Sequence, residues 1–130
     1  MTVLVGYVPN SFGEAALSAA VAEAGRREES LVVVNMSRDD VLVDAHRAAS
    51  EQLDRVRRDL AELGLAAEVR RVEEGSDAAE ALLAVAAEVD ASVLVIGLRH
   101  RTPVGKLLLG SNAQRILLEA GCPVLAVKPA

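Results

Sequence analysis

Five strand-like segments alternate along the chain with segments whose apolar residues recur at helical spacing. Four of them are short apolar runs, at residues 3–7, 31–35, 92–96 and 124–127. The segment 67–72 alternates apolar and charged residues, which predicts a strand nearer the sheet edge. The helical patterns cover residues 11–25, 44–64, 77–89 and 111–120. Strands buried on both faces produce such runs, and helical crossovers of this length link parallel strands with a right-handed sense. We therefore predict a five-stranded parallel open α/β sheet with helices on both faces, in the flavodoxin-like strand order 3-2-1-4-5.

Polar residues at the expected helix starts predict how the helices begin. Ser11 with Glu14, and Ser111 with Gln114, have the spacing of a capping box. Ser76 and Asp77 stand at the start of the third helical pattern and are favourable N-cap residues. We expect side chains at these helix starts to accept hydrogen bonds from the first backbone N–H groups of their helices.

Composition limits the class of protein. At 130 residues the chain suits a single domain over 1–130, and 52% of its residues are hydrophobic. Its net charge of −5, with Tyr7 and Phe12 as the sole aromatic residues, disfavours nucleic-acid binding. No apolar run approaches the roughly 20 residues of a membrane span, and the single Cys122 cannot form an internal disulfide. We expect a soluble cytoplasmic protein without a leader segment.

The predicted strand order places the ligand crevice past the first and fourth strands, because open parallel sheets bind ligands where the strand order reverses. The loops at this point are residues 8–11 and 97–110. The second loop carries Arg99, Arg101 and Lys106, and Gly110 and Ser111 then open a helix. A helix N-terminus presents unpaired N–H groups and the positive end of a dipole. These residues predict a site for an anionic ligand.

The spacing of glycines after the fourth strand resembles that of the universal stress protein family. That family has glycine, two residues, glycine, nine residues, glycine and then serine or threonine. Here the corresponding positions are Gly97, His100, Gly110 and Ser111, and the closing segment 122–128 is also similar. The resemblance covers essentially the whole chain. It implies a stress-response binding or regulatory module rather than a dedicated enzyme.

Two positions depart from the pattern of the family members that bind ATP. His100 stands where those members have the second glycine, which lets backbone N–H groups approach phosphate. Val8 stands where they have an aspartate that contacts the nucleoside. Losing one charge-assisted hydrogen bond costs about 1.5–3 kcal/mol, or roughly tenfold to a hundredfold in affinity. We therefore predict weakened or absent ATP binding.

Two alternatives to this interpretation stay open. In one, the chain is an ATP-binding, weakly hydrolysing switch in which arginine forks of the basic loop replace the glycine nest. In the other, it is an interaction protein that binds an unidentified protein partner and no small ligand. We therefore predict no definite cofactor. The class of ligand that the site would take is ATP, AMP or another phosphate-bearing anion.

The candidate binding residues follow the carboxyl ends of the first, second and fourth strands. They are Val8, Pro9, Asn10, Asn35, Gly97, Arg99, His100, Arg101, Gly110, Ser111 and Asn112. Structural roles compete for two of them, since Ser111 serves as a helix cap and Gly97 as a tight turn that ends its strand. We expect no catalytic residue and no metal site, because Asp39, Asp40 and Asp44 suit the start of the following helix.

The last strand has the features of a pairing edge. Val124–Val127 is short and apolar, and the predicted order leaves one side of it without a neighbouring strand. Related domains pair this strand antiparallel with its two-fold mate. We therefore expect a homodimer through Val124–Val127, an isologous interface in which one strand serves both chains.

Overall fold

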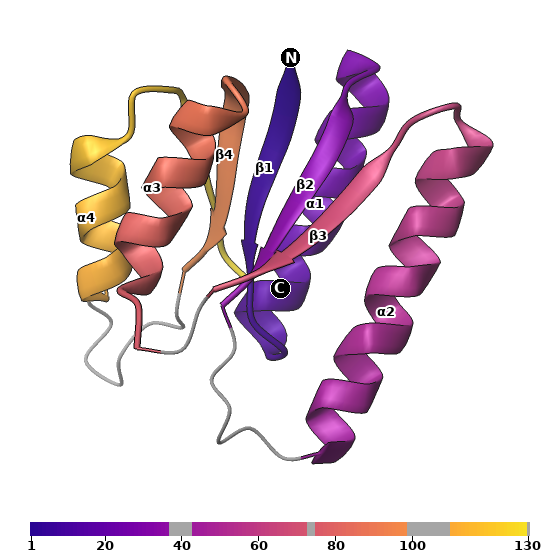
Figure 1. Cartoon of the computed structure of the whole chain (residues 1–130), viewed down its shortest axis with the longest axis horizontal. Helices are drawn as coiled ribbons and strands as arrows, with labels where there is room; N and C mark the ends of the chain where they lie inside the picture. Colours follow the sequence, from indigo (N-terminus) through magenta and orange to yellow (C-terminus); the bar gives the residue numbers. More distant parts are fainter. Residues whose placement is uncertain (37–42, 73–74, 99–109, 130) are drawn as a thin grey trace.

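A parallel sheet forms the centre of the computed structural model, which describes residues 1–36, 43–72, 75–98 and 110–129, with backbone alone for 43–49 (Figure 1). Within these residues the strands lie in the order β3-β2-β1-β4-β5, all parallel. Their bounds are Thr2–Tyr7 (β1), Ser30–Asn35 (β2), Ala67–Arg71 (β3), Ala91–Gly97 (β4) and Val124–Val127 (β5). The predicted fold class and strand order are confirmed.

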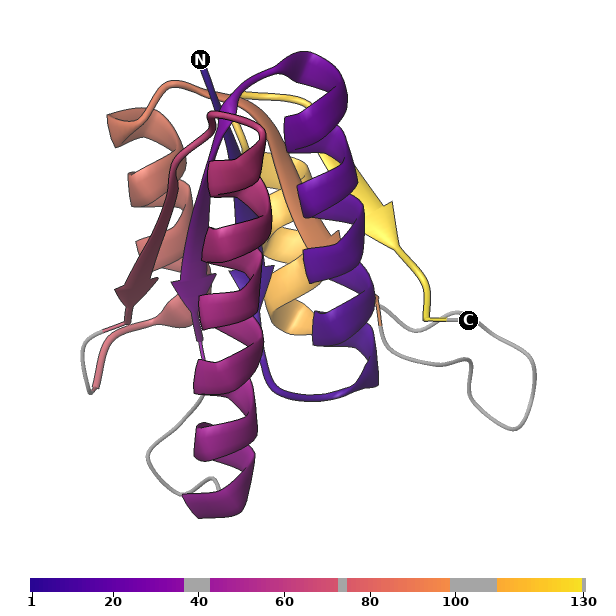
Figure 2. The same cartoon turned by 90° about the vertical axis from the view of Figure 1, so that its right-hand side faces the viewer.

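Helices cover both faces of the sheet, as Figures 1 and 2 show. The bounds of the described helices are Ser11–Arg27 (α1), Val43–Glu62 (α2), Ala78–Glu88 (α3) and Ser111–Glu119 (α4). Side chains of α1 and α2 belong to one buried cluster, and those of α3 and α4 to another. None of the described helices is both long and apolar enough to cross a membrane.

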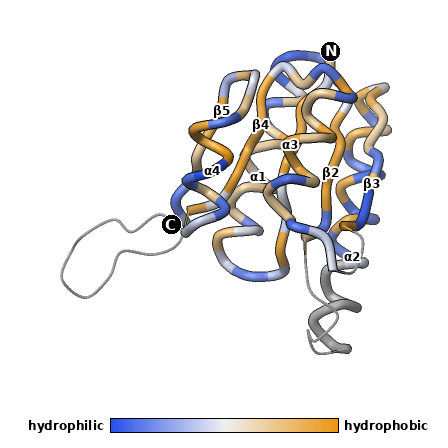
Figure 3. The backbone as a smooth tube through the Cα atoms, turned by 60° about the vertical axis from the view of Figure 1, so that its left-hand side comes forward, coloured by the Kyte–Doolittle hydropathy of each residue, from blue (hydrophilic) through white to orange (hydrophobic). Residues whose placement is uncertain are grey.

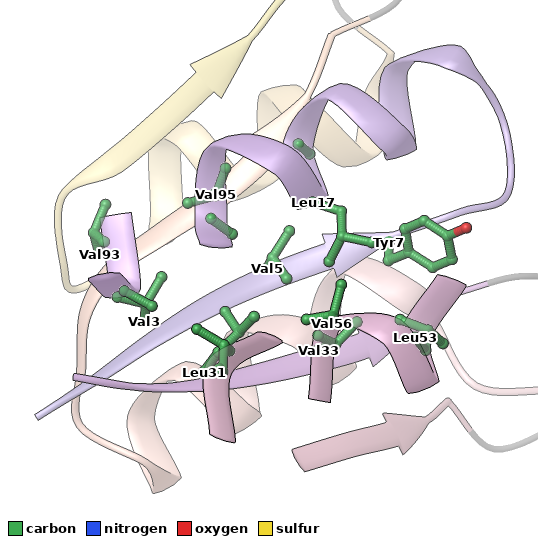
Figure 4. Close-up of a cluster of buried hydrophobic side chains, with 14 residues drawn as sticks. Val3, Val5, Tyr7, Leu17, Leu31, Val33, Leu53, Val56, Val93 and Val95 are labelled. Carbon is green, nitrogen blue, oxygen red and sulfur yellow. The ribbon is translucent and has the colours of Figure 1, made fainter. Parts of the chain in front are cut away.

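The alternation of side chains along β1 supplies both clusters. Val3, Val5 and Tyr7 pack on the α1 and α2 face (Figure 4), while Leu4 packs on the α3 and α4 face. All four are fully buried. At about 25 cal/mol per Å² of apolar surface removed from water, each such side chain contributes about 1.5–3 kcal/mol to folding. The apolar runs of the sequence therefore correspond to strands covered on both sides.

The outer strand β3 is much more polar than the central strands, and the hydropathy colouring of Figure 3 shows this difference. Glu68 and Arg71 are exposed, and Arg70 is half-buried and ion-paired with Glu68 and with Glu88 of α3. These two hydrogen bonds raise the pKa of the Arg70 guanidinium. The position at the sheet edge agrees with the alternating apolar and charged pattern of this segment.

The predicted capping box of α1 is wrong, because the N-cap residue is Asn10 rather than Ser11. The Asn10 backbone is extended, and its Oδ1 accepts a hydrogen bond from the Gly13 N–H at 2.9 Å. Asparagine is as good an N-cap as serine, so the residue with the suitable backbone angles takes the role. Glu14 instead accepts a hydrogen bond from the Tyr7 hydroxyl at 2.6 Å.

The predicted capping box of α4 is also wrong. Gly110 is the N-cap and has no side chain to offer, so Ser111 occupies the first helical position. The Gln114 N–H donates to the Gly110 carbonyl oxygen at 3.0 Å. A side chain reaches the N–H groups of the first turn from the N-cap position. Ser111 lies one residue past that position, so its hydroxyl is not the cap of α4.

Asp77 caps α3 as predicted and also connects α3 to α4. Its Oδ1 accepts a hydrogen bond from the Glu80 N–H at 3.2 Å. Its Oδ2 accepts a second hydrogen bond from Arg115 Nη1 of α4 at 3.0 Å. Arg115 is held further by Glu119, one turn along α4, at 2.7 Å. The carboxylate therefore serves as a helix cap and as an ion-pair partner between helices.

Candidate functional site

The carboxyl ends of the strands and the N-terminal ends of α1 and α4 lie at the same edge of the molecule, the lower edge in Figure 1. Eight predicted site residues at this edge are described: Val8, Pro9, Asn10, Asn35, Gly97, Gly110, Ser111 and Asn112. Arg99, His100 and Arg101 lie outside the described residues, as do Lys106, Asp39 and Asp40. The site is therefore built from the strand ends and the two helix starts.

The segment that follows β1 is packed closely onto the first turn of α1. The Val8 carbonyl oxygen accepts a hydrogen bond from the Asn10 N–H at 2.9 Å. A Cβ added at Gly13 would lie only 1.8 Å from that same oxygen, so glycine is required for this approach. The Asn10 side chain is engaged in capping α1. Val8 therefore contributes a half-buried apolar side chain to this part of the edge.

Gly97 brings the end of β4 against the same helix turn. A Cβ at this position would lie 2.2 Å from the Phe12 carbonyl oxygen and 2.7 Å from its carbon. Its φ is not left-handed, unlike those of Gly64 and Gly75, so a close backbone approach, rather than the tight turn considered above, accounts for glycine here. The next residue, Leu98, is buried and donates its N–H to the Val127 carbonyl oxygen at 2.7 Å.

The end of β2 contributes to two different faces of the sheet. Met36 donates its N–H to the Tyr7 carbonyl oxygen at 2.8 Å and packs on the α3 and α4 face. Asn35 is 9% exposed and lines a separate cavity between α2 and β3. Because successive strand residues point to opposite faces, Met36 lies on the face of α4, whereas Asn35 lies on the face of α1 and α2.

The start of α4 has the chemistry of an anion site. The first N–H groups of a helix lack intrahelical partners and lie at the positive end of its dipole. Gly110 is half-buried, while Ser111 and Asn112 are exposed at this end. Ile116 anchors the helix in the core, and Arg115 ties it to Asp77. The first turn of α4 is therefore held in a defined position.

Tyr7 is fully buried at the end of β1, where Figure 4 shows its side chain within the core cluster. It donates to Glu14 Oε1 at 2.6 Å. Burial, the hydrogen bond and the negative charge of Glu14 all raise the pKa of the Tyr7 phenol well above its ordinary value. The neutral hydroxyl thus links β1 to the first turn of α1. Sequence reasoning missed this pair, because it assigned Glu14 to a capping box with Ser11.

Other candidates for chemistry take no part in this site. Burial raises the pKa of the half-buried Cys122 thiol, although a hydrogen bond from the Leu94 backbone acts in the opposite direction. The raised pKa favours the protonated thiol. Among the described residues, no group of three or more His, Cys, Asp or Glu side chains is placed to hold a metal ion. The side chain of Asp44, predicted as part of a helix start, is not among those described.

The model of the Universal stress protein family matches residues 1–128. A universal stress protein of Mycolicibacterium smegmatis is 49% identical over 127 residues, which cover 98% of this chain and 97% of that protein. The "Universal stress protein in QAH/OAS sulfhydrylase 3'region" of Thermus aquaticus is 31% identical over 135 residues and covers 98% of each chain.

Solved structures show the same similarity. A universal stress protein from Archaeoglobus fulgidus superposes with a TM-score of 0.76 at 29% identity, covering 98% of both chains. A structure of the universal stress protein from Archaeoglobus fulgidus in complex with dAMP has a TM-score of 0.70 at 25% identity, again covering 98% of both. That complex holds a nucleotide on a fold of the same kind.

Replacement of Gly97 by alanine tests the contact between β4 and α1. Because the added Cβ would meet backbone atoms of Phe12, we expect Gly97→Ala to lower the free energy of unfolding by about 1–3 kcal/mol. Urea denaturation followed by circular dichroism measures this. Gly121→Ala is the matched control, since its Cβ meets no atom within 4 Å, and it should change stability by less than about 0.5 kcal/mol. Equal effects of the two variants would contradict the proposed contact.

The raised pKa of Tyr7, the single tyrosine of the chain, predicts a spectroscopic result. An ordinary tyrosine is half ionised at about pH 10. In the folded protein we expect no tyrosinate absorbance at that pH, and its appearance on unfolding in denaturant. Because the folded pKa is raised, this group's contribution to stability is complete below about pH 10 and is lost as the pH rises toward the folded pKa. Ionisation of the folded protein near pH 10 would show that the phenol is accessible to solvent.

Proposed function

Because the chain belongs to the universal stress protein family, we propose that it is a regulatory binding module that holds the phosphate of an adenine nucleotide weakly at the start of α4. The proposal combines two features of the same sheet edge. The first turn of α4 favours an anion, and the segment after β1 lacks a carboxylate for the nucleoside. Ligand occupancy would change the surface around α4 and the loop before it, and thereby the surface offered to a protein partner.

The observation that carries the proposal is the environment of Val8. Its side chain offers no hydrogen bond, the neighbouring Asn10 side chain caps α1, and Glu14 accepts from the buried Tyr7. The segment 8–11 contains no carboxylate that would take the place of the family aspartate. A missing charge-assisted hydrogen bond corresponds to roughly tenfold to a hundredfold weaker binding. Nucleotide affinity should therefore be limited by the nucleoside end of the ligand.

The phosphate end of the site is supported by a different set of contacts. Gly110 as N-cap leaves the first turn of α4 without a side-chain cap, and the dipole of the helix favours negative charge there. The similar Archaeoglobus fulgidus protein in complex with dAMP supports a nucleotide as ligand class. The proposed activity is binding rather than turnover. Arg99 and Arg101 of the basic loop are candidates for additional phosphate contacts.

Isothermal titration calorimetry with ATP, ADP and AMP, each with and without magnesium, tests the proposal. We expect weak, saturable binding, and we expect Val8→Asp to tighten it by roughly tenfold or more by restoring an acceptor for the nucleoside. The matched control is Ala22→Asp, which adds the same charge at an exposed position of α1. Equal effects of the two variants would mean that charge alone, and not the position after β1, decides affinity.

The same titration separates the remaining readings of the site. Loss of binding in Arg99→Ala/Arg101→Ala, with tight wild-type binding of ATP, would favour the ATP-dependent switch over the weakly binding module. No heat up to millimolar nucleotide in both wild type and Val8→Asp would overturn the proposed function and favour a module that binds proteins alone.

We further propose that the active form is a homodimer through β5. This strand lies at the sheet edge (Figure 2) and pairs with β4 on one side. Its Leu125 is 37% exposed, and Val124, Ala126 and Val127 are half-buried. Antiparallel pairing with the same strand of a second copy would satisfy the open ladder and cover these side chains.

Sedimentation equilibrium tests the dimer. We expect Leu125→Lys to shift the protein to monomers, because the two-fold axis would bring two like charges together. Leu63→Lys is the matched control, since Leu63 is 65% exposed beyond the end of α2. A monomeric wild type, or equal dissociation of both variants, would contradict the interface.

A further inference from the structure

The surface where α4 meets β5 gathers exposed apolar side chains. Of the five large hydrophobic side chains that are exposed among the described residues, three lie here: Leu117 at 40% and Leu118 at 79% on α4, and Leu125 at 37% on β5. The segment 116–127 contains a single charged residue, Glu119, although 25% of the whole chain is charged. Charged side chains are a common protection of an open strand edge. Their scarcity here indicates a surface that another protein chain covers.

Helix α4 lies at the open edge of the sheet. Its buried Ile116 belongs to the same core cluster as the half-buried Val124 and Ala126 of β5. Figures 1 and 3 show α4 as the outermost helix on this face, with α3 next to it. On this side β5 is the last strand of the described sheet. The flank of α4 that faces away from α3 therefore lies on the side of the β5 edge.

The ion pair between α4 and α3 shows which residues occupy that flank. Arg115 lies toward α3, because it is bound to Asp77 at 3.0 Å. Each residue of a helix turns about 100°, so the residues two positions before and after Arg115, Ala113 and Leu117, lie on the opposite flank. They are four residues apart and therefore neighbours on the helix surface. Leu118, three positions after Arg115, lies on the other side of the helix.

Pairing of β5 alone would make a small interface. This strand has four residues, so its edge is about 13 Å long, and one sheet layer is about 10 Å thick. Stable interfaces bury about 800 Å² per partner, which is several times the area of such a strip. A stable dimer through β5 therefore needs further contacts from the elements beside this strand.

The symmetry of strand pairing determines which contacts these are. Antiparallel pairing of β5 with itself requires a two-fold axis perpendicular to the sheet, which places the α4 helices of both copies on the same face, side by side and antiparallel. Because α4 leads into β5 through residues 120–123, the helix runs back along the strand. With nine and four residues, both elements are about 13 Å long, and the axis passes level with the middle of each. Leu117 of one copy consequently lies opposite Ala113 of the partner subunit.

We propose that the interface between two copies of this chain extends from β5 onto α4, where Leu117 of each copy packs against Ala113 of the partner subunit. This inference rests on the homodimer through β5 proposed above. A large side chain opposite a small one lets two helices approach closely. The opposite directions of the helices also place unlike ends of their dipoles together. The contact removes Leu117 from water and adds a helical layer to the strand pair.

Sedimentation equilibrium of the full chain with Leu117→Lys tests the proposal. We expect the dissociation constant of the dimer to rise at least about tenfold, because the substitution replaces a buried leucine by two like charges close to the axis. Leu118→Lys is the matched control, since Leu118 is the next residue of the same helix and is more exposed, at 79% against 40%. It lies outside the proposed contact and should change the dissociation constant by less than about twofold.

The outcomes separate the contact at α4 from the dimer on which it rests. Circular dichroism establishes that each variant is folded. Dissociation of Leu125→Lys but not of Leu117→Lys would leave the β5 dimer in place and overturn its extension onto α4. Equal effects of Leu117→Lys and Leu118→Lys would also overturn the extension. A monomeric wild type would overturn the dimer and the extension together.

Disulfide trapping is a second measurement that introduces no charge at the interface. Cys122→Ser removes the single native cysteine and supplies the background. In it, Leu117→Cys should form covalent dimers under oxidation faster than Leu118→Cys, because a disulfide needs closely spaced Cα atoms and position 117 lies near the two-fold axis. Equal rates of cross-linking at the two positions would overturn the proposed contact.

Discussion

Close backbone contact between the first turn of α1 and the ends of β1 and β4 is the constraint on which the rest of the structure depends. Gly13 lies against the Val8 carbonyl, and Gly97 lies against Phe12, at separations that a Cβ would not permit. These contacts set the path of the chain between β1 and α1, and they bring that path beside β4. The Tyr7 to Glu14 hydrogen bond links the same strand and helix turn from inside the core. The ends of β1 and β4 thus take their positions from one helix turn.

The fold could be predicted from the sequence because burial on two faces leaves a direct trace in residue type. The valines and leucines of β1, β2 and β4 have no solvent-facing side, so their runs are apolar throughout. In the same way, the alternation of apolar and charged residues along β3 indicates that this strand lies at the edge of the sheet. Helix starts were harder to predict. Asn10 and Ser11 are adjacent and equally suited to capping, and backbone angles set by the packing of α1 decide between them.

The candidate site could be predicted only in outline. The strand ends that meet at the switch point follow from topology, but the reason for Gly97 is a contact with Phe12, 85 positions earlier in the chain, that no local pattern encodes. Asn35 was assigned to the same crevice because it ends β2. The alternation of side chains along the strand places it instead on the face of α1 and α2, where it lines a cavity with Arg71. That cavity forms only once α2 packs against β3, which no local pattern of the sequence encodes.

The double role of Asp77 joins the start of α3 to the middle of α4 through one side chain. One oxygen of this carboxylate holds the start of α3, and the other holds Arg115 of α4. Removal of this one side chain would therefore take away the cap of α3 and the ion pair to α4 together.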